Sequence, residues 1–388
     1  MTAEARPPDR SGRIFGMTWP VQLRRGGWLA AQILFGLARH LRWVTRPLCR
    51  LEVIRVAHWT ILRDVPDGRG GRRKLPRPVL LFDASFDVDI RRYIEIFAEA
   101  IRWRFRAVWG RSVGYPGVIP PEAFRTWVEA QRTDAAHYYC AYEDATTRMV
   151  DSALRANDAL ERFHPLADPL DDNDFAEDFE TLRDAVANDG YSTSRRMPGQ
   201  ILRDQGDTES FLVLVPIRPG HEAALEAAFG ALGPPAPAAR PRPSPLAAVP
   251  GTHAARLTIL RGLGLPSTPG QRLPEALLCF SALVDGPLDA WLRAMAEMLG
   301  PVGDRFWSHC AGWDASDASG TARWLLAHRE RLHTCVIGHP GVTVEQVTGA
   351  LERHAHLEEL ASLARTLTPK KLRYCYDDMF GLQGADGR

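Results

Sequence analysis

Cysteines are few in this 388-residue chain, and none of them stand close together. The six cysteines are scattered along the sequence, and no Cys-x-x-Cys pair occurs. This pattern is typical of reduced, mostly buried thiols, whereas a disulfide framework or a zinc site needs closely spaced or paired cysteines. We therefore expect a reducing environment and no metal site.

Long apolar runs are missing as well. No window of about 20 residues is both apolar and free of charge, so a membrane-spanning helix is not expected. The first residues, MTAEARPPDRSGR, lack the apolar core of a secretory signal. The composition, with 45% hydrophobic and 24% charged residues, is that of an ordinary globular protein. Together these features predict a cytoplasmic protein.

Several sequence motifs of well-defined chemistry are absent. The chain contains no P-loop, no Gly-x-Gly-x-x-Gly, no Gly-x-Ser-x-Gly and no His-Glu-x-x-His. These absences argue against nucleotide-driven, serine-hydrolase and zincin chemistry. Whether the protein is an enzyme at all stays open at this stage.

An internal repeat is the most informative feature that the sequence does contain. Residues 47–115 align without a gap on residues 245–313, with 17 identities in 69 positions. About four identities are expected by chance at a background rate of roughly 6%. The matches form blocks, such as residues 60–63 with residues 258–261. Ordered blocks of this kind predict two copies of one structural unit.

The order of elements in the second copy suggests the fold of that unit. Short β-branched and aromatic runs predict strands, and apolar residues at helical spacing predict helices between them. The order is βαββαβ with extra helices, the ferredoxin-like arrangement. Strands are expected at 211–217, 256–260, 276–282 and 332–337, and helices at 221–232, 288–299, 319–329 and 343–357.

These elements define the expected domain organisation. We predict an α+β protein with two tandem ferredoxin-like repeats, residues 14–160 and 209–357, that form a pseudo-dimeric α+β barrel. Residues 161–208 are acidic and are expected to be a linker with one helix near residues 175–186. Residues 358–388 are expected to be a C-terminal tail, and residues 233–250 are expected to be a proline-rich loop.

Three segments of the first copy resemble a family of uncharacterised bacterial proteins with duplicated ferredoxin-like units. They are residues 80–97, the Trp109 to Gly117 segment and residues 138–154. A His-x-Ala-Arg motif of that family is kept as His253-Ala254-Ala255-Arg256, whereas the first copy has Arg55-Val56-Ala57-His58. The family is distantly similar to the dimeric α+β-barrel superfamily that contains dye-decolourising peroxidases and chlorite dismutases. The resemblance implies a cavity between the halves, with haem as the candidate cofactor and oxidoreductase activity if the protein is an enzyme.

Strand alternation selects candidate site residues, because successive side chains point to opposite faces of a sheet. The polar residues His58, Asp83 and Arg256 are expected on the inner face and are the catalytic candidates. His137 and His253 are the candidates for cofactor binding. A His beside a carboxylate can act as an acid, a base or an oriented ligand. The alternative is that these residues satisfy one another in a polar but inert interface.

Other positions that recur in both copies have simpler explanations. Asp87 and Asp285 each stand where a strand ends and a helix begins, so helix capping is their expected role. Trp109 and Trp307 are expected in the core, and Gly114 and Gly312 in turns.

The segment near the N-terminus is basic, with sixteen Lys/Arg and five Asp/Glu in residues 1–78. Within it, residues 28–44 predict a helix with one apolar face. Such a helix can lie in a membrane interface with its arginines near anionic headgroups. The alternative is that this is the first helix of the first copy, matching residues 221–232, with its apolar face in the core. No nucleic-acid-binding motif is present, so nucleic acid is not an expected partner. The apolar residues on this face are Leu29, Ile33, Leu37, Leu41 and Val44.

Two hypotheses follow from the sequence. The first is a protein that binds a small apolar or haem-like ligand between its halves, with redox chemistry if it is an enzyme. The second is a non-catalytic interaction or scaffold protein at the surface of a membrane. The oligomeric state is open in both.

Overall fold

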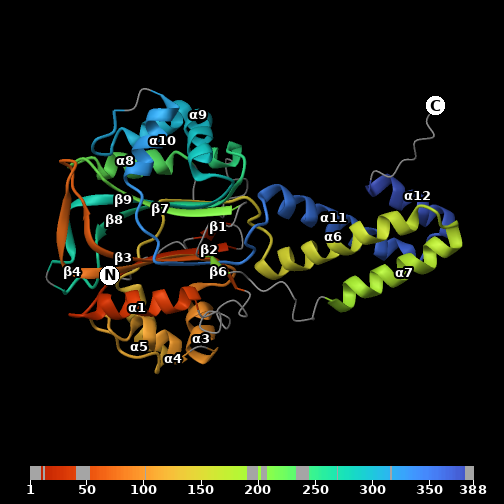
Figure 1. Cartoon of the computed structure of the whole chain (residues 1–388), viewed down its shortest axis with the longest axis horizontal. Helices are drawn as coiled ribbons and strands as arrows, with labels where there is room; N and C mark the ends of the chain where they lie inside the picture. Colours follow the sequence, from red (N-terminus) through yellow and green to blue (C-terminus); the bar gives the residue numbers. More distant parts are fainter. Residues whose placement is uncertain are drawn as a thin grey trace, which may run out of the picture. The chain divides into compact units, whose positions relative to one another are not determined.

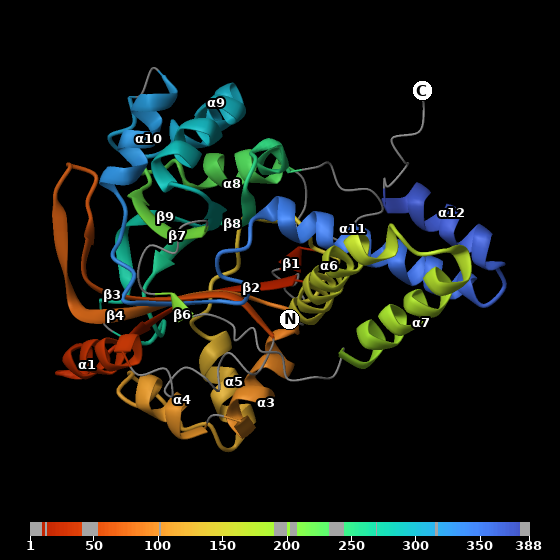
Figure 2. The same cartoon turned by 45° about the vertical axis from the view of Figure 1, so that its right-hand side comes forward.

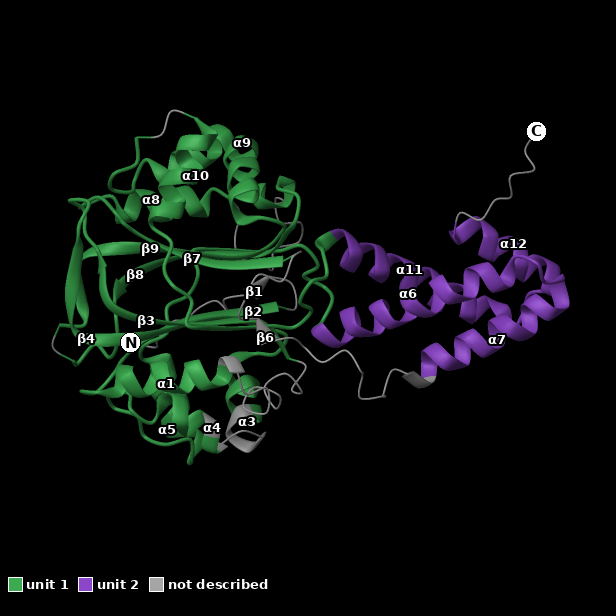
Figure 3. Ribbon diagram, in the orientation of Figure 1, with its two compact units in different colours: residues 1–146, 198–344 green, residues 147–197, 345–388 purple. Residues whose placement is uncertain are grey.

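The computed structural model describes residues 10–11, 14–40, 53–100, 102–189, 200–201, 208–232, 244–268, 270–314 and 317–380. The chain divides into two compact units (Figure 3). The first unit, residues 1–146 and 198–344, contains the β-strands and has a mixed α+β structure. The second unit, residues 147–197 and 345–388, is helical over its described residues.

Two antiparallel sheets form the centre of the first unit, with helices on the outer face of each sheet (Figures 1 and 2). One sheet has the strand order β1-β2-β4-β3-β10-β6, in which β1 and β6 are two-residue strands, and the other has the order β5-β8-β9-β7. The strands of the first sheet are β1 (Arg10–Ser11), β2 (Ile14–Gln22), β3 (Ile54–Pro66), β4 (Arg72–Phe86), β6 (Gln200–Ile201) and β10 (Thr334–Ile337). Those of the second sheet are β5 (His137–Cys140), β7 (Thr208–Pro216), β8 (Thr252–Gly262) and β9 (Arg272–Asp285).

The helices of the first unit fall into two layers, one for each sheet (Figure 1). The layer on the first sheet consists of α1 (Gly27–His40), α3 (Ile90–Ala100), α4 (Arg102–Trp109) and α5 (Pro121–Glu129). The layer on the second sheet consists of α8 (Glu222–Gly230), α9 (Leu288–Trp307) and α10 (Ala318–Ala327).

The last strand of each half pairs with the other half. Strand β5 from the first half pairs with β8, and β10 from the second half pairs with β3. The predicted ferredoxin-like repeats would each keep their own fourth strand, so this exchange departs from the prediction. Strand pairing uses main-chain hydrogen bonds, which every sequence can form. The sequence therefore does not show which sheet edge the strand His137–Cys140 joins.

The hairpin β3–β4 of the first sheet and the hairpin β8–β9 of the second sheet pair their strands at positions that the sequence alignment also matches. His58 of β3 lies opposite Asp83 of β4, and Arg256 of β8 lies opposite Ser281 of β9. The alignment of the two copies places His58 on Arg256 and Asp83 on Ser281, so the two pairs are equivalent. Each hairpin also has a register shift near its start and another beyond its centre.

Each sheet packs against its helices through an aromatic core. Trp19 is 4.2 Å from Trp109 and 5.0 Å from Trp127 between ring centroids. Trp109 and Trp307 are both buried, as predicted. Gly114 and Gly312 both have positive φ angles, 71° and 68°, and a Cβ atom on Gly114 would lie 2.6 Å from Leu265. The predicted turn role of these glycines is confirmed.

The space between the sheets is filled by side chains. One part is apolar and brings together leucines of both sheets, among them Leu81, Leu212 and Leu277. The rest is polar and includes the catalytic candidates, each of which is at most 2% exposed. The inner faces therefore form a packed layer where the sequence predicted a ligand-binding cavity.

The second unit is a helical bundle that the sequence did not predict. Its core is aromatic, with Phe163, Phe175, Phe179 and Tyr376 in mutual contact. The segment predicted as a linker contains a long helix that covers the predicted one, and the predicted C-terminal tail contributes another. The domain boundaries thus differ from those predicted. The helices of this unit are α6 (Thr147–Ala167), α7 (Asp172–Asp189), α11 (Val344–Ala364) and α12 (Pro369–Phe380).

Parts of two predicted segments fall outside the described residues. Residues 233–243 of the proline-rich loop are not described, whereas residues 245–248 form a short 3₁₀ helix. Leu41 and Val44 of the predicted amphipathic helix also lie outside the described residues.

Candidate functional site

The three catalytic candidates meet between the two sheets. Asp83 lies 3.3 Å from the guanidinium of Arg256, measured from Oδ2 to Nη1. The Nδ1 atom of His58 is 3.8 Å from Asp83 Oδ1, which is too long for a hydrogen bond. Strand alternation thus placed these side chains on the correct face.

Two hydroxyl groups complete the surroundings of the Asp83 carboxylate. Thr18 donates a hydrogen bond to Oδ2 at 2.8 Å, and Ser281 donates one to Oδ1 at 2.9 Å. Arg256 in turn donates to the Thr18 hydroxyl and to the carbonyl oxygen of Ala84, both at 2.9 Å. The ion pair is therefore held by hydrogen bonds from both sheets.

Gly16 of β2 and Ser210 of β7 each suit the size of the side chain that faces them from the other sheet. The sequence analysis did not select either residue. A Cβ atom on Gly16 would lie 2.8 Å from the guanidinium carbon of Arg256, so glycine makes room for the arginine. At the equivalent place in the other half, the Ser210 hydroxyl is hydrogen-bonded to Nε2 of His58. The sequence held one indication of this difference. Arg256 stands where the first copy has His58, and the longer arginine needs a smaller residue opposite it.

Burial decides the protonation state of His58. Desolvation lowers the pKa of His58 to about 4, against the raising effect of Asp83 and with a further lowering by Arg256. His58 is therefore neutral near pH 7. A neutral histidine at 3.8 Å from the carboxylate, closed off by packed side chains, is a structural group of the interior.

Acid should destabilise the fold through two buried histidines. Burial also lowers the pKa of His137 to about 4, so His58 and His137 bind protons more weakly in the folded chain than in the unfolded chain. Stability should therefore fall as pH decreases from about 6.5 to about 4, by up to about 3 kcal/mol for each histidine. Urea unfolding across this range measures the loss.

The matched variant for this pH dependence is His137→Gln, which can keep a hydrogen bond to Ser244. In this variant, the part of the acid-induced loss of stability that is due to histidine should be about half as large as in the wild type. Between pH 7 and pH 8, the stability of both the variant and the wild type should hardly depend on pH. An unchanged slope in His137→Gln would contradict the assignment.

His137 is separate from the catalytic candidates. Its neighbour Tyr138 points between the sheets, with its ring centroid 5.6 Å from the guanidinium carbon of Arg256. His137 points to the opposite face of β5, where Nε2 is 2.8 Å from the Ser244 hydroxyl. His137 therefore does not join His58 and Asp83, because the strand register puts it on the other face of β5.

His253 belongs to a second buried cluster at the end of the sheets. Its Nε2 is 2.7 Å from Asp285, and its Nδ1 is 2.8 Å from the Tyr142 hydroxyl. The equivalent pair in the first half is Arg55 and Asp87, 3.3 Å apart. Arg55 also lies over the Tyr142 ring, 4.5 Å from its centroid. The cluster links the two halves through Tyr142.

In this second cluster, the surroundings of Arg55 and Tyr142 keep the arginine charged and the phenol neutral. Burial would lower the pKa of Arg55, but Cys140, Tyr142, Asp87 and Tyr138 raise it above its ordinary value. Burial raises the pKa of the Tyr142 phenol, while Arg55 acts in the opposite direction. Tyr142 is thus a neutral hydrogen-bonding group, and Arg55 is a charged one.

Asp285 bonds to a helix that is distant in sequence, and not to the start of the next one. Its Oδ2 atom accepts a hydrogen bond from the backbone N–H of Val344, the first residue of α11, at 2.9 Å. The first residue of α9, Leu288, donates its backbone N–H to Glu209 instead. Asp285 therefore accepts a hydrogen bond from the start of a helix, as predicted, but the helix is α11 and not the next one, α9. Its counterpart Asp87 pairs with Arg55.

The surroundings of the histidines do not fit a haem. His253 has both ring nitrogens bonded to protein side chains, and His58 and His137 each have Nε2 bonded to a serine. All three are enclosed by packed residues, so an axial bond and a macrocycle would both displace them. Among the described residues, no group of three or more His, Cys, Asp or Glu is arranged to hold a metal ion.

A different candidate site lies on the surface, along α1. Residues 27–38 of this helix contain no charged residue. Ala31, Phe35 and Ala38 are buried. The three exposed apolar side chains are Leu29, Ile33 and Leu37, at 50, 57 and 49%. Because four-residue spacing repeats on one face of a helix, these side chains form a continuous apolar stripe that faces away from the sheet.

Helix α8 shows that the fold does not require this stripe. The backbone N–H of Arg24 donates a hydrogen bond to the carbonyl oxygen of Arg111, and that of Arg218 donates one to the carbonyl oxygen of His309. The helices that follow the two arginines, α1 and α8, therefore occupy matching positions. Phe35 then matches the buried Phe229. The stripe residues match three alanines: Ala223, Ala227 and Ala231.

The stripe also lies in a basic part of the sequence. Residues 10–51 contain eight arginines and no acidic residue, and residues 100–121 contain four arginines and no acidic residue. Matched ranges differ between the halves. Residues 24–38 have two arginines and no acidic residue, whereas residues 218–232 have one arginine and two glutamates, and residues 298–319 have one arginine and three aspartates. The first half therefore combines the exposed apolar stripe with an excess of arginine, whereas the matched ranges of the second half have an excess of acidic residues.

Comparison with models of known protein families and with curated proteins gives no match for this chain. Among the described helices, none is both long enough and apolar enough to cross a bilayer.

Proposed function

We propose that this protein is a non-catalytic interaction protein that binds the surface of anionic membranes through the helix layer of its first half. The observation that supports this best is the exposed Leu29, Ile33 and Leu37 stripe of α1 within a segment rich in arginine and free of acidic residues. An interfacial helix inserts its apolar face at the boundary of headgroups and acyl chains, and nearby arginines interact with anionic lipids.

The interior gives less support to the alternative of a small ligand between the sheets. His58, Asp83 and Arg256 are engaged with one another and with Ser210, Thr18 and Ser281, and all three are buried. A ligand would have to replace these contacts, which cost several kcal/mol to break when charges are buried. We propose that the polar layer instead specifies how the two halves pair.

The fold also agrees with a pseudo-dimer produced by duplication. We propose that two related α+β halves exchanged their last strands, which would make each half dependent on the other. The match of the His58–Asp83 and Arg256–Ser281 pairs in the register of the sequence repeat supports this proposal.

Vesicle sedimentation tests the membrane function. The full chain should sediment with vesicles rich in phosphatidylserine and remain in solution with vesicles of phosphatidylcholine alone. Binding should weaken as salt is raised from about 0.05 to about 0.5 M, because ions screen the arginines.

Three other results would overturn the proposal. Absence of sedimentation with either vesicle would remove the membrane function. Concentration-dependent dimers that bury α1 would make this surface an interface between copies of the chain. A Soret band produced by haemin, and lost in His58→Ala or His253→Ala, would restore the ligand-binding hypothesis.

A further inference from the structure

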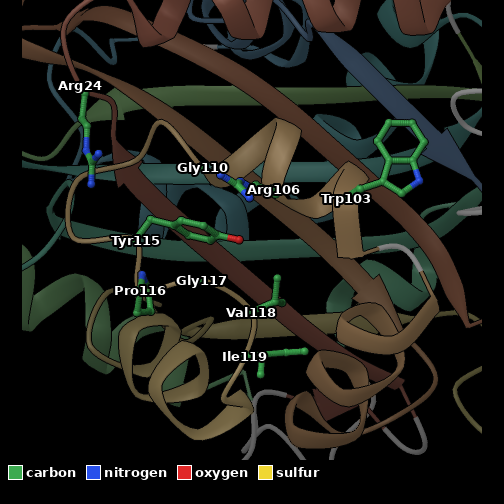
Figure 4. A pocket seen from close by; sticks show the side chains of 9 residues that line it. All are labelled: Arg24, Trp103, Arg106, Gly110, Tyr115, Pro116, Gly117, Val118 and Ile119. Atoms are coloured by element: carbon green, nitrogen blue, oxygen red, sulfur yellow. The ribbon is translucent and has the colours of Figure 1, made fainter.

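A cleft opens in the same helix layer, between the residues that precede α1, helix α4 and the loop before α5 (Figure 4). Its volume is about 660 Å³, which is within the usual size range of small-molecule sites. Arg24 lies toward one end of the cleft and Trp103 toward the other, with Arg106 and Tyr115 between them (Figure 4). Val118 and Ile119 line a further side.

The cleft combines two cations with an apolar and aromatic lining. Neither Arg24 nor Arg106 forms an ion pair with any residue that the structure describes, and both are exposed. The exposed Trp103 and Ile119, at 56 and 53%, add apolar surface at the rim. Guanidinium groups bind phosphate oxygens well, because their planar N–H groups match the geometry of two oxygens.

The second half shows that these features are not imposed by the fold. The residue that corresponds to Arg106 is Asp304, and the residue that corresponds to Trp103 is Pro301. Arg218, which corresponds to Arg24, donates hydrogen bonds to the carbonyl oxygens of Cys310 and Trp313, at 3.1 and 3.2 Å. In that half the arginine supports a turn, whereas in the first half the two arginines are available to a ligand.

We propose that this cleft binds the phosphate headgroup of an anionic phospholipid, with Arg24 and Arg106 on the phosphate and the apolar wall against the glycerol and the first acyl carbons. This inference rests on the proposed membrane function and adds a specific ligand to it. The stripe of α1 provides apolar contact with the bilayer, and the cleft selects the lipid.

Calorimetric titration of the full chain with a short-chain lipid tests the cleft without a membrane. Dihexanoyl phosphatidic acid, kept below its micelle concentration, should bind at one site. The variant Arg24→Gln with Arg106→Gln should bind about 30-fold more weakly, since each arginine near an anionic lipid contributes about fivefold. Arg323→Gln with Arg331→Gln removes the same charge from exposed positions in the second half and should bind as the wild type does.

The remaining probes separate the sources of phosphate. Dihexanoyl phosphatidylcholine should bind weakly, and inorganic phosphate alone should bind weakly too, because it leaves the apolar wall uncovered. Equal binding of inorganic phosphate and the lipid would refute a lipid site. Equal losses in the two double variants would show a general effect of charge and would also refute it.

The two proposals can fail separately. If the chain sediments with anionic vesicles but does not bind the soluble lipid, the cleft proposal is wrong and the membrane function stands. If the soluble lipid binds but no vesicle does, the cleft is a lipid site and the membrane-docking role of α1 is wrong.

Discussion

Replacing Asp83 with asparagine should lower the free energy of unfolding by about 3–5 kcal/mol, because it leaves the Arg256 charge buried without its partner. Both side chains are buried, and the guanidinium packs closely against Gly16. Arg256→Met should cost a similar amount for the converse reason. Urea unfolding followed by tryptophan fluorescence measures both losses.

The double variant Asp83→Asn with Arg256→Met distinguishes the ion pair from general damage to the core. It should be more stable than the sum of the two single losses predicts, since neither charge is then left alone. The exposed pair of Glu226 and Arg261 is the matched control, and Glu226→Gln should cost less than about 1 kcal/mol. Additive losses in the double variant would show that the buried pair is not coupled.

Changing Leu29, Ile33 and Leu37 together to alanine should abolish most of the membrane binding without destabilising the fold. Removal of roughly 100 Å² of exposed apolar surface weakens insertion by about 2–3 kcal/mol, which is a loss of at least about 30-fold. The free energy of unfolding should change by no more than about 0.5 kcal/mol, because the positions are exposed and alanine favours helix. Vesicle sedimentation and urea unfolding give the two readouts.

This variant reproduces the alanines that the α8 segment carries at the same positions, so the fold has already accepted them. Met298→Ala removes an exposed apolar side chain from the second half and serves as the control, with unchanged vesicle binding expected. A large loss of stability in the triple variant would mean that the stripe is part of the core. Full vesicle binding by a stable triple variant would rule out α1 as the membrane contact.

The sequence was most informative where a strand has two different faces. Alternation placed His58 and Asp83 toward the opposite sheet, and the contacts agree with it. It could not place His137, because every residue from 136 to 142 suits either face of a half-buried strand. Only the hydrogen-bond register with β8 decides that Tyr138, and not His137, faces Arg256.

The sequence also left the orientation of α1 undecided. This helix is apolar on two sides, and periodicity predicts a stripe without showing which side is covered. Packing of Phe35 and Ala31 on the first sheet decides the matter, and it leaves the Leu29 stripe exposed. The alternative of a first helix that packs on the core of the first copy is thus correct for Ala31 and Phe35, whereas the Leu29, Ile33 and Leu37 face lies outside the core.

By itself the sequence determined much of the local structure: most helices and strands, and the faces of the central strands, follow from the different periodicities of helix and strand. The tertiary structure decided what those elements pair with. The exchange of β5 and β10, the helical unit formed by residues on either side of the second half, and the hydrogen bond from Val344 to Asp285 join residues far apart in the chain. Backbone hydrogen bonds and apolar contacts can form between many partners, so only the packing of the whole chain selects among them.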